Sequence, residues 1–174
     1  MTAHALAMIV TLLDFTDPAD VALWRPVDDV VMGGVSRSLF SQAEPGIARF
    51  HGNVSLENFG GFASVRTAPR DWDIAHARAF VLRVRGDGRQ YKFTLRTSDR
   101  FDGIQYQARF TSPAGEWTDV RLPVDAFVPT FRGRRVPFAP AFDPDQVRAL
   151  GFTISDKQAG PFELLVDRIA AERH

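Results

Sequence analysis

The sequence predicts an all-β protein, a sandwich or a barrel, with very little helix. Short apolar or alternating runs are separated by Gly, Pro, Asp and Asn along the whole chain, a pattern typical of such folds. The chain has 174 residues, of which 45% are hydrophobic and 24% charged, the balance of a soluble globular protein. We therefore expect residues 1–174 to form one domain with a substantial core.

The apolar runs place ten strands along the chain, each bounded by turn-forming residues. The expected strands are Met8–Phe15, Val35–Phe40, Ile47–Ser55, Phe62–Thr67, Ala79–Arg85, Gln90–Arg96, Ile104–Phe110, Trp117–Leu122, Ala149–Ser155 and Phe162–Ala170. The first run lacks a preceding basic region, and Asp14 ends it before it reaches the length of a membrane span. We therefore expect no membrane span and a cytoplasmic location.

Helix is expected at two places only. Asp17–Leu23 begins with an N-cap Asp followed by Pro, and Asp143–Leu150 begins in the same way. Between the strands, Pro123–Pro144 is the longest stretch without a strand pattern. We interpret it as a long ordered loop that is either functional or covers a sheet edge.

Alternation is clearest in the three consecutive strands between residues 79 and 110. If these strands are neighbours, one face of their sheet is apolar and packs on a second sheet. The other face then carries polar side chains, which are Arg83, Arg85, Lys92, Arg96, Gln105, Gln107 and Arg109. That face is either solvated or a binding surface.

The charge balance and the lack of cysteine exclude several functions. The 21 basic residues equal the 21 acidic ones, which argues against a binder of duplex nucleic acid. The absence of Cys excludes disulfides, Cys-ligated zinc, iron–sulfur clusters and thiol catalysis. Lys92 and Lys157 are the two lysines, so 19 of the 21 basic residues are arginines. This bias indicates either recognition of anions or the codon usage of a GC-rich genome.

No catalytic constellation is readable. Phosphate-loop and dinucleotide motifs are missing, and Gly34–Ser38 departs from a nucleophile elbow at its last position. A hydrolase using Asp28 or Ser36 remains the least favoured reading, because no base lies at a recognisable spacing. We therefore expect a non-enzymatic protein without catalytic residues, cofactor or catalytic metal; a structural Ca²⁺ stays an open alternative.

Two segments carry paired glycines. In the first, Trp24–Ser36, an apolar stretch ends at Gly33-Gly34; the second is Asn58–Arg66. One interpretation is a tight turn or bulge in which Asp28 and Asn58 accept hydrogen bonds from backbone N–H groups. The other is a close approach of a ligand to the backbone.

These segments resemble a known family. Asp29–Ser36, reading Asp-Val-Val-Met-Gly-Gly-Val-Ser, and Gly60–Arg66 are similar to the motifs of the complex I intermediate-associated protein 30 family. The pattern from Trp117 to Gly133 and the run Gly151–Gln158 are also similar, so the resemblance spans about residues 13–171. It implies a stand-alone bacterial-type member with a galactose-binding-domain-like jelly roll, related to carbohydrate-binding modules.

The resemblance implies assembly of complex I, the NADH:ubiquinone oxidoreductase, through protein partners such as its subunits or assembly intermediates. Two loops would supply the contacts, and their candidate residues are Asp28, Asp29, Ser36, Arg37, Asp156, Lys157 and Gln158. The alternative is a carbohydrate ligand on the polar face, with Trp72 or Trp117 at the rim. Its polar contacts would be Arg83, Arg96, Gln105, Gln107 and Arg109.

Overall fold

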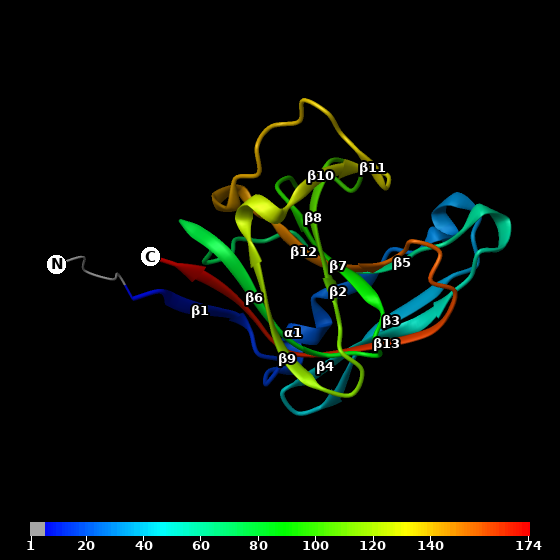
Figure 1. The fold of residues 1–174 in the computed structure, drawn as a ribbon, viewed down its shortest axis with the longest axis horizontal. Helices are drawn as coiled ribbons and strands as arrows, with labels where there is room; N and C mark the ends of the chain where they lie inside the picture. The colour runs from blue at the N-terminus through cyan, green and yellow to red at the C-terminus, as the bar shows by residue number, and fades with distance from the viewer. Residues whose placement is uncertain (1–5) are drawn as a thin grey trace.

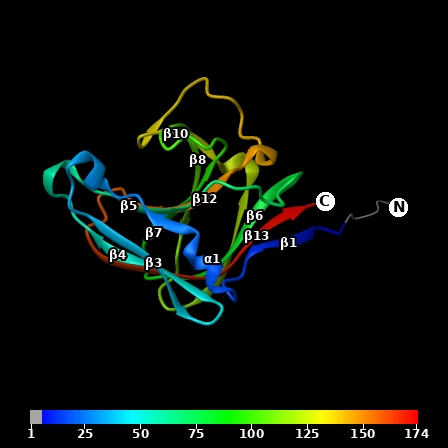
Figure 2. The ribbon, with the colours of Figure 1, turned by 180° about the vertical axis from the view of Figure 1, so that it is seen from behind.

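The predicted jelly-roll sandwich of antiparallel sheets is confirmed. A computed structural model describes residues 6–174, apart from the side chain of Val31. Two sheets face one another, and the chain passes repeatedly between them (Figures 1 and 2). One short α-helix, α1 (Pro18–Ala22), accompanies them.

The first sheet has six strands, in the order β3-β4-β13-β6-β9 with β1 paired to β13. Their bounds are β1 Met8–Leu13, β3 Arg37–Glu44, β4 Ile47–Val54, β6 Ala77–Arg85, β9 Trp117–Pro123 and β13 Gly160–Arg173. The long β13 pairs with β4 along its first half and with β6 along its second half. Because β1 pairs with the last residues of β13, these two segments lie side by side (Figure 1).

The second sheet has seven strands, in the order β11-β10-β8-β7-β12-β5-β2. Their bounds are β2 Trp24–Pro26, β5 Ala63–Thr67, β7 Gln90–Arg96, β8 Gln105–Thr111, β10 Val128–Phe131, β11 Arg134–Arg135 and β12 Ala149–Ile154. Four single 3₁₀ turns join the strands: η1 Asp29–Met32, η2 Glu57–Phe59, η3 Val124–Ala126 and η4 Pro144–Gln146.

All ten predicted strands overlap strands of the structure, whereas β2, β10 and β11 were not predicted. These three lie at the two edges of the second sheet. They are only two to four residues long, and β2 and β10 contain Pro26 and Pro129. Short edge strands with proline lack the alternation on which the prediction depends. The stretch Pro123–Pro144 is therefore not a structureless loop.

Both predicted helical turns are present, but the second is shorter than its predicted bounds. The first is confirmed, since the Asp17 carboxylate accepts a hydrogen bond of 2.9 Å from the Ala19 N–H at the start of α1. The second, Asp143–Leu150, stops after one turn, η4. The reason is sheet pairing: the Arg148 N–H donates to the Arg96 carbonyl at 2.7 Å, and β12 begins at the next residue.

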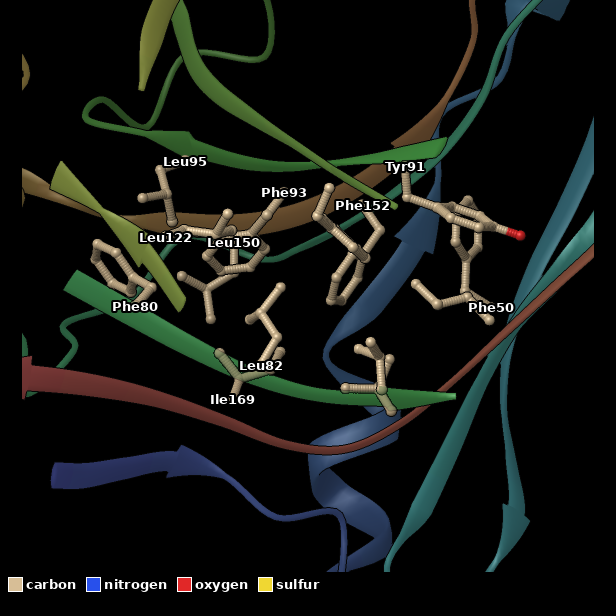
Figure 3. Packing of buried hydrophobic residues seen from close by; sticks show 14 of the residues in the cluster. Phe50, Phe80, Leu82, Tyr91, Phe93, Leu95, Leu122, Leu150, Phe152 and Ile169 are labelled. Atoms are coloured by element: carbon tan, nitrogen blue, oxygen red, sulfur yellow. The ribbon is translucent and has the colours of Figure 1, made fainter. Parts of the chain in front are cut away.

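An aromatic layer between the sheets forms the core (Figure 3). Phe152 of β12 is fully buried at its centre. Its ring centroid lies 5.4 Å from that of Phe93 and 5.6 Å from that of Trp24. Phe50 of the first sheet lies 6.4 Å away, so this side chain joins both sheets. Such rings bury a large apolar area and favour tilted or offset contacts.

The prediction that the strands between 79 and 110 share one polar face is partly wrong. β7 and β8 pair as expected, but β6 belongs to the first sheet. Arg83 and Arg85 therefore lie on the outer face of the opposite sheet, where Arg83 lies 3.4 Å from Asp167. Alternation determines which face of its own strand a residue occupies and carries no information about which sheet that strand joins.

We expect Phe152→Ala to lower the free energy of unfolding by about 3–5 kcal/mol, because it leaves a cavity where both sheets meet. Urea unfolding followed by circular dichroism measures this change. Phe138→Ala is the control, since that side chain is fully exposed, and we expect it to change stability by less than about 0.5 kcal/mol. Equal stability of the two variants would contradict the assignment of the core.

Candidate binding surfaces

The Asp29 carboxylate is buried and ties together three segments of the chain. It accepts hydrogen bonds from the Ser36 N–H at 2.9 Å and the Ser36 hydroxyl at 2.6 Å. It also accepts bonds from the N–H groups of Gly61 at 2.7 Å and Phe62 at 3.3 Å. A buried charge is stable when its oxygens accept several hydrogen bonds, so Asp29 joins the first glycine-rich segment to the second.

Asp28 makes a second, parallel set of contacts. Its carboxylate accepts bonds from the Ser38 hydroxyl at 2.6 Å, the Ser38 N–H at 2.9 Å and the Ser64 N–H at 3.0 Å. The two adjacent carboxylates therefore have different partners and do not form an acid dyad. We call Asp28, Asp29 and their bonded partners the carboxylate hub.

The paired glycines allow the backbone to approach this hub. A Cβ atom on Gly34 would lie 2.4 Å from the Asp29 carboxyl carbon, and one on Gly60 would lie 2.6 Å from its Oδ2. The other member of each pair, Gly33 or Gly61, has a positive φ of 91° or 144°. In each pair, one glycine leaves room for Asp29 and the other adopts a conformation that side chains disfavour.

The hydrogen bonds hold Asp29 in its charged form. Burial disfavours the carboxylate, but the bonds from Ser36, Gly61 and Phe62 outweigh this effect. The pKa of Asp29 therefore lies below its usual value of 3.8.

The hub places exposed apolar side chains at one end of the molecule, on the blue and teal turns at the right of Figure 1. We call this set the apolar tip; it consists of Val30, Met32, Val35, Leu56 and Phe59. Phe59 is fully exposed, and both Phe59 and its neighbour Asn58 have positive φ. Bulky residues seldom adopt this conformation, so the turn holds an apolar ring in solvent at a conformational cost.

The sequence pattern alone does not reveal the tip. Four of its residues lie in the two glycine-rich segments, Trp24–Ser36 and Asn58–Arg66, and Leu56 lies two positions before the second. The available signal was the apolar stretch at Val30–Met32, which neither alternates nor continues into a strand.

Three predicted contact residues lie inside the hub. Asp29 and Ser36 are buried, and only 9% of Asp28 is exposed. The Ser36 hydroxyl donates to Asp29 and accepts from the Ser55 N–H at 2.9 Å, and no histidine of the described residues 6–174 contacts it. These side chains position the turns and leave no free polar atom for a partner, whereas Arg37 is exposed.

The outward side of the second sheet is the second candidate surface. We call it the polar face, and it comprises Ser64, Arg66, Lys92, Thr94, Arg96, Gln105, Gln107, Arg109 and Thr153. Lys92, Thr94 and Arg96 are less than 10% exposed. Neighbouring turns shield the two cations: Lys92 donates to Ser155 and Asp156, and Arg96 donates to carbonyls of residues 100–103.

The turn after β12 borders this face. Asp156 pairs with Lys92 at 3.4 Å and with Arg109 at 3.3 Å. The side-chain amide of Gln158 accepts a hydrogen bond from the Gln90 N–H and donates one to the Gln90 carbonyl. It thus satisfies backbone groups of β7 that a neighbouring strand would otherwise bond. Lys157 is exposed. The structure thus brings Asp156 and Arg109 together and places Gln158 in a structural role.

A cavity of about 370 Å³ opens on the polar face beside β10 and β11, lined in part by Gln107, Arg109 and Arg135. Gln105 lies next to it, with its side-chain oxygen 3.5 Å from the Arg96 guanidinium. Neither predicted rim tryptophan lies over this cavity: Trp117 belongs to the first sheet, and Trp72 packs under Arg70.

Two further properties concern the described residues 6–174 as a whole. No helix among them is long and apolar enough to cross a membrane. No group of three or more His, Asp or Glu side chains in this range is placed to hold a metal ion.

The chain matches the sequence model of one protein family and is similar in sequence to several known proteins. The family model for complex I intermediate-associated protein 30 matches residues 13–166. The mitochondrial protein of that name from Neurospora crassa is 30% identical over 155 residues, which cover 79% of this chain and 56% of the relative. Its counterpart from Drosophila melanogaster is 26% identical over 183 residues, covering 92% of this chain and 62% of the relative. The chain thus spans less than two thirds of each.

Solved structures show the same fold at low identity. A family 11 carbohydrate-binding module of a Clostridium thermocellum cellulase superposes with a TM-score of 0.73 and 14% identity, covering 96% of this chain and 95% of the module. The module in complex with a β-1,3-1,4-mixed-linked tetrasaccharide gives a TM-score of 0.71 and 15% identity, covering 96% of each chain. This likeness concerns the galactose-binding-like β-sandwich alone.

We expect Asp29→Asn to lower the free energy of unfolding by about 2–4 kcal/mol at pH 7, since an amide cannot accept all the hydrogen bonds that the carboxylate accepts. Because the folded pKa of Asp29 is lowered, its contribution to stability is present above pH 3.8 and lost as the pH falls through the folded value. Urea unfolding at several pH values should therefore show that the free energies of unfolding of the wild type and of Asp29→Asn approach each other in acid. Asp125→Asn, at an exposed position, is the control. A difference in unfolding free energy between the wild type and Asp29→Asn that stays constant down to pH 2 would contradict a role of the Asp29 charge.

Proposed function

Because this chain belongs to the complex I intermediate-associated protein 30 family, we propose that it is a non-catalytic binding module that associates with a protein partner during assembly of a respiratory complex. The named relatives support this role, and the partners would be subunits or assembly intermediates of complex I.

The observation that carries the proposal is the apolar tip. Exposed apolar side chains on two rigidly joined turns suit an interface, because a partner would remove them from water. Phe59 is the central anchor: it is fully exposed and held by a left-handed turn, so little backbone freedom is lost on binding.

Polar residues would complete the interface. Arg37 is exposed beside the hub and Lys157 lies on the turn after β12, so both can form charged contacts at its rim. Asp28, Asp29 and Ser36 act on the partner indirectly, by holding the tip in place. Asp156 orders the neighbouring basic residues.

The proposal includes the absence of catalysis. The relatives are named for association with complex I intermediates, and the Ser36 hydroxyl is engaged within the hub. The cytoplasmic location stays a prediction, since the proteins to which the chain is similar are named mitochondrial.

The test is capture of partners from the native organism with the tagged chain. We expect the wild type to recover complex I subunits and Phe59→Asn to recover at least about fivefold less, as expected for removal of an interface anchor. Asn tolerates the left-handed conformation, so the variant should fold. Phe138→Asn is the matched control, because Phe138 is also fully exposed with a positive φ of 63° but lies outside the tip.

Two results would contradict this function. Equal recovery by both variants would exclude the tip as the interface. An unchanged amount of assembled complex I in a deletion strain would exclude the assembly role.

Carbohydrate binding on the polar face is the second candidate. The cavity beside β10 places the planar amide of Gln107 next to Arg109, and such groups bond to sugar hydroxyls. The likeness of the fold to carbohydrate-binding modules supports this reading. Among the described residues 6–174, no aromatic side chain lines this cavity, so the polar groups would carry the recognition.

Calorimetry with the mixed-linked β-1,3-1,4 tetrasaccharide tests this candidate. We expect binding that Gln107→Ala weakens by about tenfold, the effect of losing one or two hydrogen bonds. Arg83→Ala is the control, because Arg83 lies on the opposite sheet and should not affect the affinity. A flat titration with this probe would remove carbohydrate binding of this class.

A further inference from the structure

A second cavity, of about 280 Å³, lies at the other end of the polar face and has four arginines in its wall. These are Arg25, Arg66, Arg96 and Arg100. Arg96 of β7 and Arg66 of β5 lie on either side of β12, where Ala149 pairs with Arg96 and Gly151 pairs with Arg66. Ala149, which lies between the two arginine strands, also lines the cavity.

Arg96 is the most deeply placed of the four, with 8% of its surface exposed. Its Nη2 donates to the carbonyl of Phe101 at 2.9 Å, and other carbonyls and the Gln105 amide lie at 3.4–3.5 Å. Its Nε is buried and has no hydrogen-bond partner among the described residues. Burial and the nearby Arg66 together lower the pKa of Arg96 to about 10, although Asp102 acts in the opposite direction.

Within residues 6–174, Arg66 forms no ion pair either. Its guanidinium lies 4.4 Å from the centre of the Phe101 ring, and burial lowers the pKa of Arg66. Arg25 donates to the carbonyls of Ala22 and Trp24, both at 2.9 Å, so it too is held by neutral groups.

The nearby carboxylates are bound elsewhere. Asp99 lines the cavity but pairs with Arg148 at 2.7 Å, and Asp102 pairs with Arg132 at 2.6 Å. Within residues 6–174, none of the four cavity arginines has a carboxylate within 4.0 Å. Arg96 is buried and Arg66 is half-buried, whereas Arg25 and Arg100 are exposed. Buried positive charge without a counter-ion is unfavourable, and a bound anion would relieve the repulsion between Arg66 and Arg96.

We propose that this cavity binds the phosphate group of a small phosphate monoester. A single carboxylate has only one negative charge and two acceptor oxygens to offer several guanidinium groups. A phosphate monoester dianion has two charges and three acceptor oxygens, which suit the forked guanidinium donors better. Pro26, Val27 and Phe101 supply an apolar wall for the organic part of the ligand. The volume of about 280 Å³ suits a small molecule rather than a polymer.

This site is independent of the proposed protein interface. It uses none of the residues of the apolar tip, and it is separate from the cavity lined by Gln107 and Arg109. Failure of either proposal therefore leaves the other untouched.

Calorimetry and thermal unfolding of the full chain with phenyl phosphate, at constant ionic strength in chloride, test the proposal. We expect saturable binding and a rise in Tm, because a ligand that binds the native state stabilises it. Arg66→Gln and Arg96→Gln should each weaken binding at least about tenfold, as expected for loss of a charge-assisted contact. Arg135→Gln, in the wall of the other cavity, should change the affinity less than about twofold.

Arg66→Gln keeps the test decisive if loss of Arg96 impairs folding, since Arg66 makes no hydrogen bond to the described chain that would be lost. Binding of phenyl phosphate with wild-type affinity by Arg66→Gln would overturn the site. Absence of binding above the chloride background would overturn it as well. Benzoate bound as tightly as phenyl phosphate would overturn the assignment to a phosphate monoester.

Discussion

The buried carboxylate of Asp29 is the interaction on which one end of this molecule depends. It attracts N–H and O–H donors from residues 7, 32 and 33 positions away and thereby joins two turns that have no strand pairing of their own. The glycines at 34 and 60 exist in this arrangement because any Cβ there would collide with the carboxylate. Two sequence motifs that look like independent turns are therefore two halves of one structure around a single charge.

This arrangement separates polar from apolar roles. The polar members of the motifs are used internally, so their hydrogen bonds stabilise the fold, while the apolar members, above all Phe59, are left in solvent. The usual expectation for a surface site, polar residues outside and apolar residues inside, is reversed at the tip. That reversal is the physical reason to place a protein interface there.

The zero net charge conceals an uneven distribution. On the outer face of the first sheet, arginines meet carboxylates; Arg78 and Arg121 both bind Glu172, at 2.8 and 2.9 Å. At one end of the polar face of the second sheet, Arg66 and Arg96 have no carboxylate within 4.0 Å among residues 6–174. A balance taken over the whole chain therefore carries no information about local potential, which depends on which charges the strand pairing brings together.

Local alternation and turn residues are enough to predict ten of the described strands and, in the three strands between residues 79 and 110, the side that faces the core. The sequence pattern misses β2, β10 and β11, because edge strands of two to four residues, two of them with a proline, are too short to show alternation. Long-range strand pairing places Arg83 and Arg96 on opposite sheets, brings Gly61 to Asp29, and sets Arg66 and Arg96 beside one cavity. These three placements depend on pairing between residues that are distant in sequence, and such pairing cannot be predicted from a local sequence pattern.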